Sequence, residues 1–196
     1  MTVPTSTPIR KFITRTLSLA LLHSMIVAAP LLAADKTNHH MAAHEQTASS
    51  TLVQAVRNGT RQFIDVNNAT AAGYGPFLGC VSGTDHGAMG IHYVNPTLLG
   101  NLTLDPAQPQ ALIYEPSNGK LTLVGVEFIL DSATWLAANN NTPPVLDGQV
   151  FNFVGAPNRF NIPSFFEIHV WAWRDNPQGA FVDWNNHVTC AGQSTN

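Results

Sequence analysis

Charged side chains are scarce in this chain. Lys, Arg, Asp and Glu together make up 11% of its 196 residues, whereas roughly 25% is usual for soluble domains. The net charge is −3 at neutral pH, and no cluster of Lys or Arg follows the first 34 residues. Binding to nucleic acid or to an anionic membrane surface calls for such a basic patch. We therefore expect neither as a partner and favour a small, neutral or weakly charged ligand.

Several enzyme signatures are also missing. The chain contains no nucleophile elbow, no phosphate-binding glycine loop, no dinucleotide fingerprint and no zincin pair of histidines. These absences argue against acyl-transfer hydrolases and against nucleotide chemistry.

Cysteine is rare, with only Cys80 and Cys190. In an exported protein an even pair predicts a disulfide, and free thiols or metal thiolates are the alternative. Closing a loop of about 110 residues would stabilise the fold by roughly 4 to 5 kcal/mol in the chain-entropy model.

Only one long apolar run is present. Three basic residues precede an uncharged stretch from Leu17 to Ala33, which predicts a secretory signal peptide over residues 1–34. The stretch is short for a spanning helix, so we expect a secreted or periplasmic protein with no stable membrane anchor after cleavage. The polar tract 35–50 is typical of a flexible leader. Residues 51–196 are expected to form a single β-rich domain. The sequence does not indicate the oligomeric state.

The hydrophobic pattern changes near residue 75. Apolar residues from Ser50 to Ala72 follow helical spacing interrupted at Asn58-Gly59, which predicts one broken helix or two short ones. Beyond this point the apolar residues come in short runs bounded by Gly, Pro, Asn and Asp, as strands do. A helical turn is expected at Asp131 to Ala138. The pattern favours an all-β barrel or sandwich with a short N-terminal helical extension, and an α+β roll is the alternative.

A β-hairpin is predicted around Asn118-Gly119, a dipeptide suited to a type I′ turn. If these residues form the turn, Tyr114 pairs with Leu123. Alternation of side chains then places Glu127 on the same face of the sheet as Tyr114 and Leu123. The same alternation places Glu115 on the opposite face. Glu127 is therefore the carboxylate expected inside the domain.

The apolar segment from Ser164 to Trp173 contains two ionisable residues on one strand face, Glu167 and His169. The same period places three aromatic residues beside them: Phe165, Trp171 and Trp173. A polar pair among bulky rings is unusual for an outward surface and typical of a cavity lining.

Two other apolar runs contain one ionisable residue each, His92 and Glu127. Burying such groups costs free energy unless a partner satisfies them. Two imidazoles with one or two carboxylates are a common ligand set for a divalent metal. We therefore predict a site formed by His92, Glu127 and His169 that suits iron, copper, manganese or zinc.

Further roles are predicted for the neighbouring candidates. His86, in a glycine-flanked loop, is a candidate additional ligand. Glu167 is a candidate to orient a metal-bound histidine or, like Glu127, to act in acid–base catalysis. The alternative for these groups is structural, as core residues in a satisfied polar network or, for His86, as an exposed loop histidine.

Three sequence blocks stand out between residues 72 and 190: GPFLGCVSGTDHGAMGIHYVNP, ALIYEPSNGKLTLVGVEFILD and FFEIHVWAWRDNPQGAFVDWNNHVTC. They resemble a family of exported, mostly bacterial proteins, and the resemblance implies no activity. In the cupin pattern a His-x-His and a Glu lie within a few residues, whereas the candidates here lie on separate strands. A cupin-like barrel is thus an analogy of architecture only.

Three functional hypotheses follow from these observations. The first is a secreted or periplasmic metal-binding protein, and its more specific form is a mononuclear metalloenzyme that oxidises or hydrolyses a small or carbohydrate-like molecule. The second is a metal-free module of the cell envelope that binds a small organic ligand. The third is a structural domain with a buried polar network.

Overall fold

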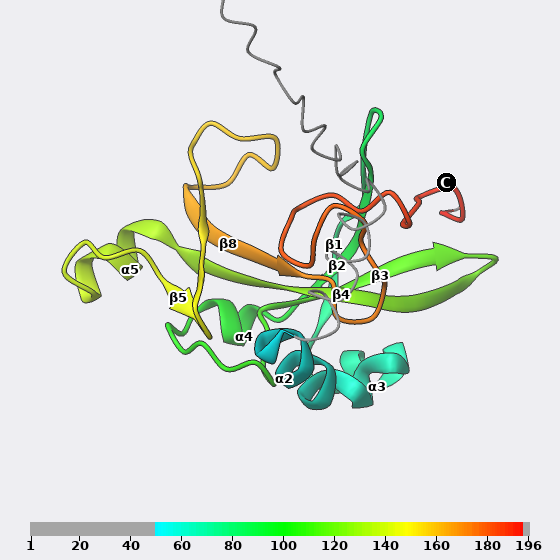
Figure 1. The fold of residues 1–196 in the computed structure, drawn as a ribbon, viewed down its shortest axis with the longest axis horizontal. Helices are drawn as coiled ribbons and strands as arrows, with labels where there is room; N and C mark the ends of the chain where they lie inside the picture. Colours follow the sequence, from blue (N-terminus) through cyan, green and yellow to red (C-terminus); the bar gives the residue numbers. More distant parts are fainter. Residues whose placement is uncertain (1–49, 194–196) are drawn as a thin grey trace, which may run out of the picture. The chain divides into compact units, whose positions relative to one another are not determined.

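Six antiparallel strands form the main sheet in residues 50–193, the part of the chain that the computed structural model describes. The strand order is β1-β2-β3-β4-β8-β7, and the sheet curls into a half-barrel (Figure 1). Its strands are β1 (Gly75–Gly83), β2 (Gly87–Val94), β3 (Ala111–Ser117), β4 (Lys120–Asp131), β8 (Phe165–Val170) and β7 (Asn152–Val154). Two short strands, β5 (Val145–Leu146) and β6 (Gln149–Val150), pair separately. The predicted all-β class is confirmed.

The predicted signal peptide, residues 1–34, and residues 35–49 of the predicted leader lie outside the described residues. Within the described part, no helix has the length and apolar character needed to cross a membrane.

The helical elements are short. The predicted broken helix consists of α2 (Thr51–Thr60), η1 (Arg61–Ile64) and α3 (Val66–Ala71), and α2 runs through Asn58-Gly59, where the sequence pattern predicts the interruption. The other two helices are α4 (Pro96–Leu99) and α5 (Ser132–Ala138), the second of which confirms the predicted turn. The Asp131 side chain caps α5 by accepting from the Thr134 amide.

One face of the sheet packs against the N-terminal helices (Figure 1). Apolar residues of α2 interlock with inward side chains of β3, β4 and β8, including Leu112, Phe128 and Ile168. The Tyr114 hydroxyl donates to the Phe63 carbonyl at 2.7 Å and so ties β3 to η1. This packing leaves the opposite face of the sheet for other contacts.

The hairpin has the predicted turn, because Asn118 and Gly119 both have positive φ. Tyr114 pairs with Leu123 as expected, but a bulge at Val124 then shifts the register. The prediction that Glu127 shares the face of Tyr114 and Leu123 is therefore wrong. The extra residue turns Glu127 to the face away from the helices.

Glu115 is buried too, although alternation marked it as the outer carboxylate. It pairs with Arg174 and accepts from the Thr189 amide at 2.9 Å. A disulfide joins Cys80 to Cys190. These contacts hold the segment after β8 across the sheet face opposite the helices (Figure 1).

Gly90 on β2 has no room for a side chain. Its φ is +97°, and an added Cβ would lie 2.8 Å from the Tyr114 carbonyl oxygen. Gly119 has a similar φ of +73° but nothing within 4 Å. We expect Gly90→Ala to lower the free energy of unfolding by about 1 to 3 kcal/mol more than Gly119→Ala, because overpacking adds to the backbone strain. Urea unfolding of both variants measures the difference. Equal losses of unfolding free energy would show that β2 shifts to accommodate the added methyl group.

Candidate metal site

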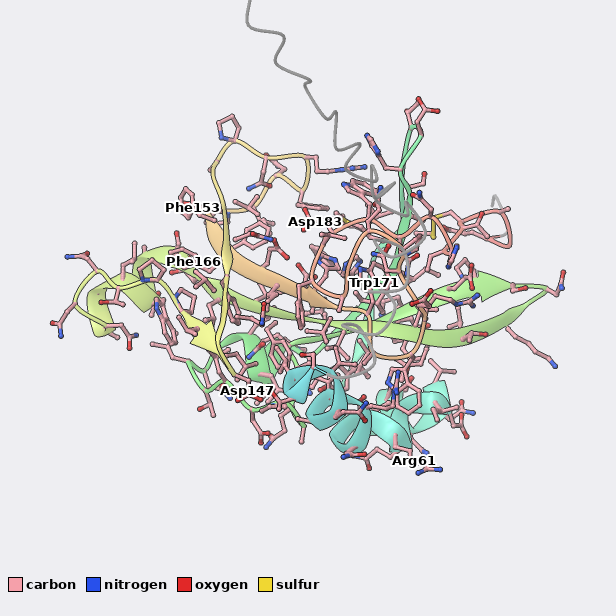
Figure 2. The ribbon with its side chains drawn as sticks, viewed as in Figure 1. Arg61, Asp147, Phe153, Phe166, Trp171 and Asp183 are labelled. Atoms are coloured by element: carbon pink, nitrogen blue, oxygen red, sulfur yellow. A yellow bond between two sulfur atoms is a disulfide. The ribbon has the colours of Figure 1, made fainter. Side chains whose placement is uncertain are left out.

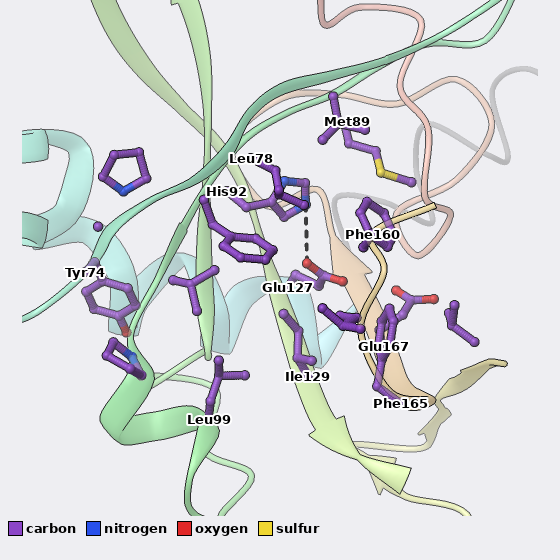
Figure 3. Close-up of a pocket in the computed structure, with 18 of the residues that line it drawn as sticks. Tyr74, Leu78, Met89, His92, Leu99, Glu127, Ile129, Phe160, Phe165 and Glu167 are labelled. Carbon is purple, nitrogen blue, oxygen red and sulfur yellow. Dashed lines mark ion pairs between the residues drawn. The ribbon is translucent and has the colours of Figure 1, made fainter. Parts of the chain in front are cut away.

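Three strands bring His92, Glu127 and His169 together on the face of the sheet away from the helices. The His92 Nε2 atom lies 3.2 Å from Glu127 Oε2 and 3.4 Å from His169 Nε2. All three side chains are buried, with 2–7% of each residue exposed. Figure 3 shows His92 and Glu127 facing each other across the site. Residues that are 77 positions apart in sequence thus present converging donor atoms.

His92 and Glu127 come from strands that are not neighbours in the sheet. Glu127 and His169 are direct partners on neighbouring strands, but β3 separates β2 from β4. Neighbouring strands are about 4.8 Å apart, so His92 and Glu127 must reach toward each other over β3. Ala111 pairs with Glu127 and is fully buried. The β3 partner of His92 is Ile113, which is also fully buried.

The spacing of the donor atoms fits a bound ion. A metal about 2.1 Å from each ligand atom separates neighbouring ligands by about 3.0 Å in octahedral and about 3.4 Å in tetrahedral geometry. Two of the three separations, 3.2 and 3.4 Å, fall in this range. The three ligand atoms all lie within 4.8 Å of one another, so these buried groups could hold a metal ion.

Glu167 orients His169 from the far side of the ring. The His169 Nδ1 atom lies 3.0 Å from Glu167 Oε2, and Glu167 Oε1 accepts from the side-chain Nδ2 of Asn152 at 2.9 Å. An imidazole that donates from Nδ1 presents the lone pair of Nε2 to the site. Metal-bound histidines usually have such a carboxylate partner.

The predicted strand from Ser164 to Trp173 is correct in placing Glu167 and His169 on one face, but it is too long. The strand β8 ends at Val170, after which the chain turns. Trp173 consequently packs with the helix-side core, where its indole donates to the Thr60 hydroxyl at 3.0 Å. Trp171 stays beside His169, with ring centroids 6.0 Å apart.

Asp183 is a member of the cluster that the sequence did not reveal. Its Oδ1 atom lies 3.9 Å from His169 Nδ1, and it forms a second group with Glu167 and His169. The loop that carries it is fixed by Trp171, whose indole donates to the Val182 carbonyl at 2.6 Å. Figure 2 shows Asp183 on one side of the sheet and Arg61, in η1, on the other. The one signal available was an acidic residue within the apolar run Phe181 to Trp184.

Burial and mutual charge shift the pKa values within the cluster. Burial, aided by His169, lowers the pKa of His92 to about 3, so this ring is neutral. Burial raises the pKa of Glu127 to about 8. Burial by itself would lower the pKa of His169, but Glu127 and Glu167 outweigh it and raise that pKa to about 9. Without a metal, the cluster therefore holds protons at neutral pH that a cation would replace.

His86 is not brought to the site. It is exposed in the turn between β1 and β2, with its ring 6.5 Å from that of Trp184. It belongs to neither group of converging donor atoms in the described part of the chain. A turn residue at the end of a hairpin points away from the sheet centre, where His92 lies.

The cluster forms the polar floor of a cavity of about 850 Å³. Figure 3 shows the apolar side chains that surround it. They include Tyr74, Phe77, Leu78, Met89, Phe160 and Phe165. A concave apolar site with a few converging polar groups is the usual form of a small-molecule pocket.

Comparison of the chain with protein-family models, curated proteins and solved structures finds no match. The geometry of the site is therefore the basis for a function.

Proposed function

We propose that this protein binds one divalent transition metal ion through His92, Glu127 and His169. The observation that carries the proposal is the convergence of two Nε2 atoms and one carboxylate oxygen, at separations that match neighbouring ligands of one ion. Two imidazoles and one carboxylate suit iron, zinc, copper or manganese. Three protein ligands leave positions open for a substrate, as catalytic sites require.

The proposed activity is metal-assisted oxidation or hydrolysis of a small organic molecule. A bound ion would supply Lewis acidity or redox chemistry. Glu167 Oε2, 3.0 Å from His169 Nδ1, is placed to accept from that nitrogen and so to leave Nε2 of the neutral ring for an ion. Asp183 lines the cavity and is half-exposed, which places a carboxylate within reach of a bound molecule for proton transfer. The disulfide supports the further proposal of a secreted or periplasmic location.

Metal content measured by elemental analysis tests the proposal. The full protein, loaded with Zn²⁺ or Fe²⁺ and then treated with a weak chelator, is expected to retain about one equivalent. The His92→Ala/His169→Ala variant should retain none. The His86→Ala/His187→Ala variant is the matched control, because it removes two exposed histidines and should retain the metal. Equal metal content in wild type and both variants would contradict the proposed site.

A second candidate is a metal-free binding module. Among the described residues, each buried side-chain nitrogen or oxygen has a hydrogen-bond partner. The cluster is therefore satisfied as a network of its own. In that case the His92→Ala/His169→Ala variant would lose stability and would show no change in metal content.

A further inference from the structure

We infer that the cavity above the cluster binds a neutral, largely apolar molecule whose single hydroxyl or carbonyl oxygen faces the metal site. The inference rests on the proposed function and adds the class of ligand. Three observations support it: the character of the cavity walls, its exposed apolar rim and the charge of its floor.

The walls favour an apolar body. The volume of about 850 Å³ lies within the roughly 300 to 1,000 Å³ typical of pockets for drug-sized molecules. Aromatic and aliphatic side chains from β1, β2 and the loop before β8 line most of it. A carbohydrate needs hydrogen-bonding groups along its whole length. The aromatic side chains of the wall do not supply them: Phe77, Phe160 and Phe165 have no polar atoms, and the Tyr74 hydroxyl donates to the Pro109 carbonyl at 2.8 Å.

The rim carries exposed apolar side chains. Phe77 and Leu78 line the cavity, yet 42% and 58% of their surfaces are exposed. Leu78 adopts a φ of +57° in a bulge of β1, a conformation that is uncommon for residues other than glycine. The bulge presents a large apolar side chain at the mouth of the cavity. Such a rim suits the entry of an apolar molecule.

The floor disfavours an anionic ligand. Glu127, Glu167 and Asp183 bring three carboxyl groups to it, and no Lys or Arg is among the described residues that line the cavity. The +2 charge of a divalent ion is set against these three carboxyl groups, so the floor offers no excess positive charge. A carboxylate or phosphate would find no additional cation. A neutral oxygen atom can coordinate the ion, whereas a hydrocarbon offers no polar atom to the groups of the floor.

Three fluorescent probes that share one ring system test the inference: naphthalene, 2-naphthol and 2-naphthoate. Titration of the zinc-loaded full protein should give a Kd for 2-naphthol at least tenfold lower than for the other two. Removing zinc should abolish the preference over naphthalene. Leu99→Glu, which places a charge on the cavity wall, should weaken all three probes, whereas Val150→Glu, which alters an exposed residue outside the cavity, should not.

The outcomes separate the two proposals. Zinc uptake without a preference for 2-naphthol overturns the ligand class and leaves the metal site intact. Tighter binding of 2-naphthoate would show that the floor is cationic. Failure to take up zinc overturns the metal site and the oxygen preference together. Unchanged binding in Leu99→Glu would place the probes outside this cavity.

Discussion

Replacement of Glu127 by Gln is expected to weaken metal binding strongly while leaving the metal-free protein at least as stable as the wild type at pH 8. Glu127 is buried, and burial raises its pKa to about 8, because the ionised form is costly there. The neutral amide has nearly the same shape and avoids that cost. It is also a far weaker metal ligand, so we expect the affinity for Zn²⁺ to fall more than 100-fold, beyond the 10- to 100-fold typical when an outer partner of a ligand is removed.

Glu115→Gln provides the matched control for this variant. Glu115 is equally buried but lies outside the metal cluster and pairs with Arg174. Its replacement should cost about 1 kcal/mol, because the partly exposed Arg174 loses a charged acceptor, with no change in metal affinity. Urea unfolding of the metal-free proteins and Zn²⁺ competition with a chelator give both quantities. If Glu127→Gln instead lowers stability and keeps the metal, Glu127 is a structural residue.

The elements and several of the site residues could be predicted from local sequence patterns. The helical spacing before residue 72 and the Asn118-Gly119 turn depend on neighbours in sequence, and both are confirmed. Polar residues placed in apolar runs identified His92, Glu127 and His169, whose ligand atoms the structure brings within 4.8 Å of one another. Burial of an ionisable group is visible in sequence because it breaks an apolar run.

The remaining features depend on contacts between distant segments. The bulge at Val124 reversed the face of Glu127. Its one sequence signal is Gly125, since a glycine within a strand often marks a bulge or a close backbone approach; here a Cβ would lie 2.9 Å from the Val170 carbonyl oxygen. Asp183 reaches the cluster because Trp171 anchors its loop, a contact that no spacing rule predicts. His86 shows the converse, since proximity in sequence to His92 does not bring it to the site.

Metal affinity is expected to rise steeply with pH, by at least tenfold per pH unit between pH 6 and 8. A metal ion needs an ionised Glu127 and a neutral His169, whereas in the metal-free cluster their pKa values are raised to about 8 and about 9. Binding at these pH values must therefore release at least one proton. His92 does not compete, because its pKa is lowered to about 3.

The same shifts determine the stability of the metal-free protein. A group whose pKa is raised on folding stabilises the folded state below its ordinary pKa, and that stabilisation is lost as the pH rises through the folded value. For His169 this stabilisation is lost between about pH 6.5 and about pH 9. Thermal unfolding should therefore show the metal-free protein weakening from pH 7 to 9, and the stabilisation by Zn²⁺ growing over the same range.

Calorimetry in buffers of different ionisation enthalpy counts the released protons directly. We expect at least one per Zn²⁺ at pH 7.5 in the wild type. Exposed histidines have an ordinary pKa near 6.5, so adventitious binding to them would release few protons at this pH and would level off above pH 7. An affinity that stops rising at pH 7, and that persists in the His92→Ala/His169→Ala variant, would assign the metal to surface histidines. A continued rise to pH 8 that disappears in that variant is the signature of the buried cluster, because only groups held close to other carboxylates keep their protons so far above the ordinary range.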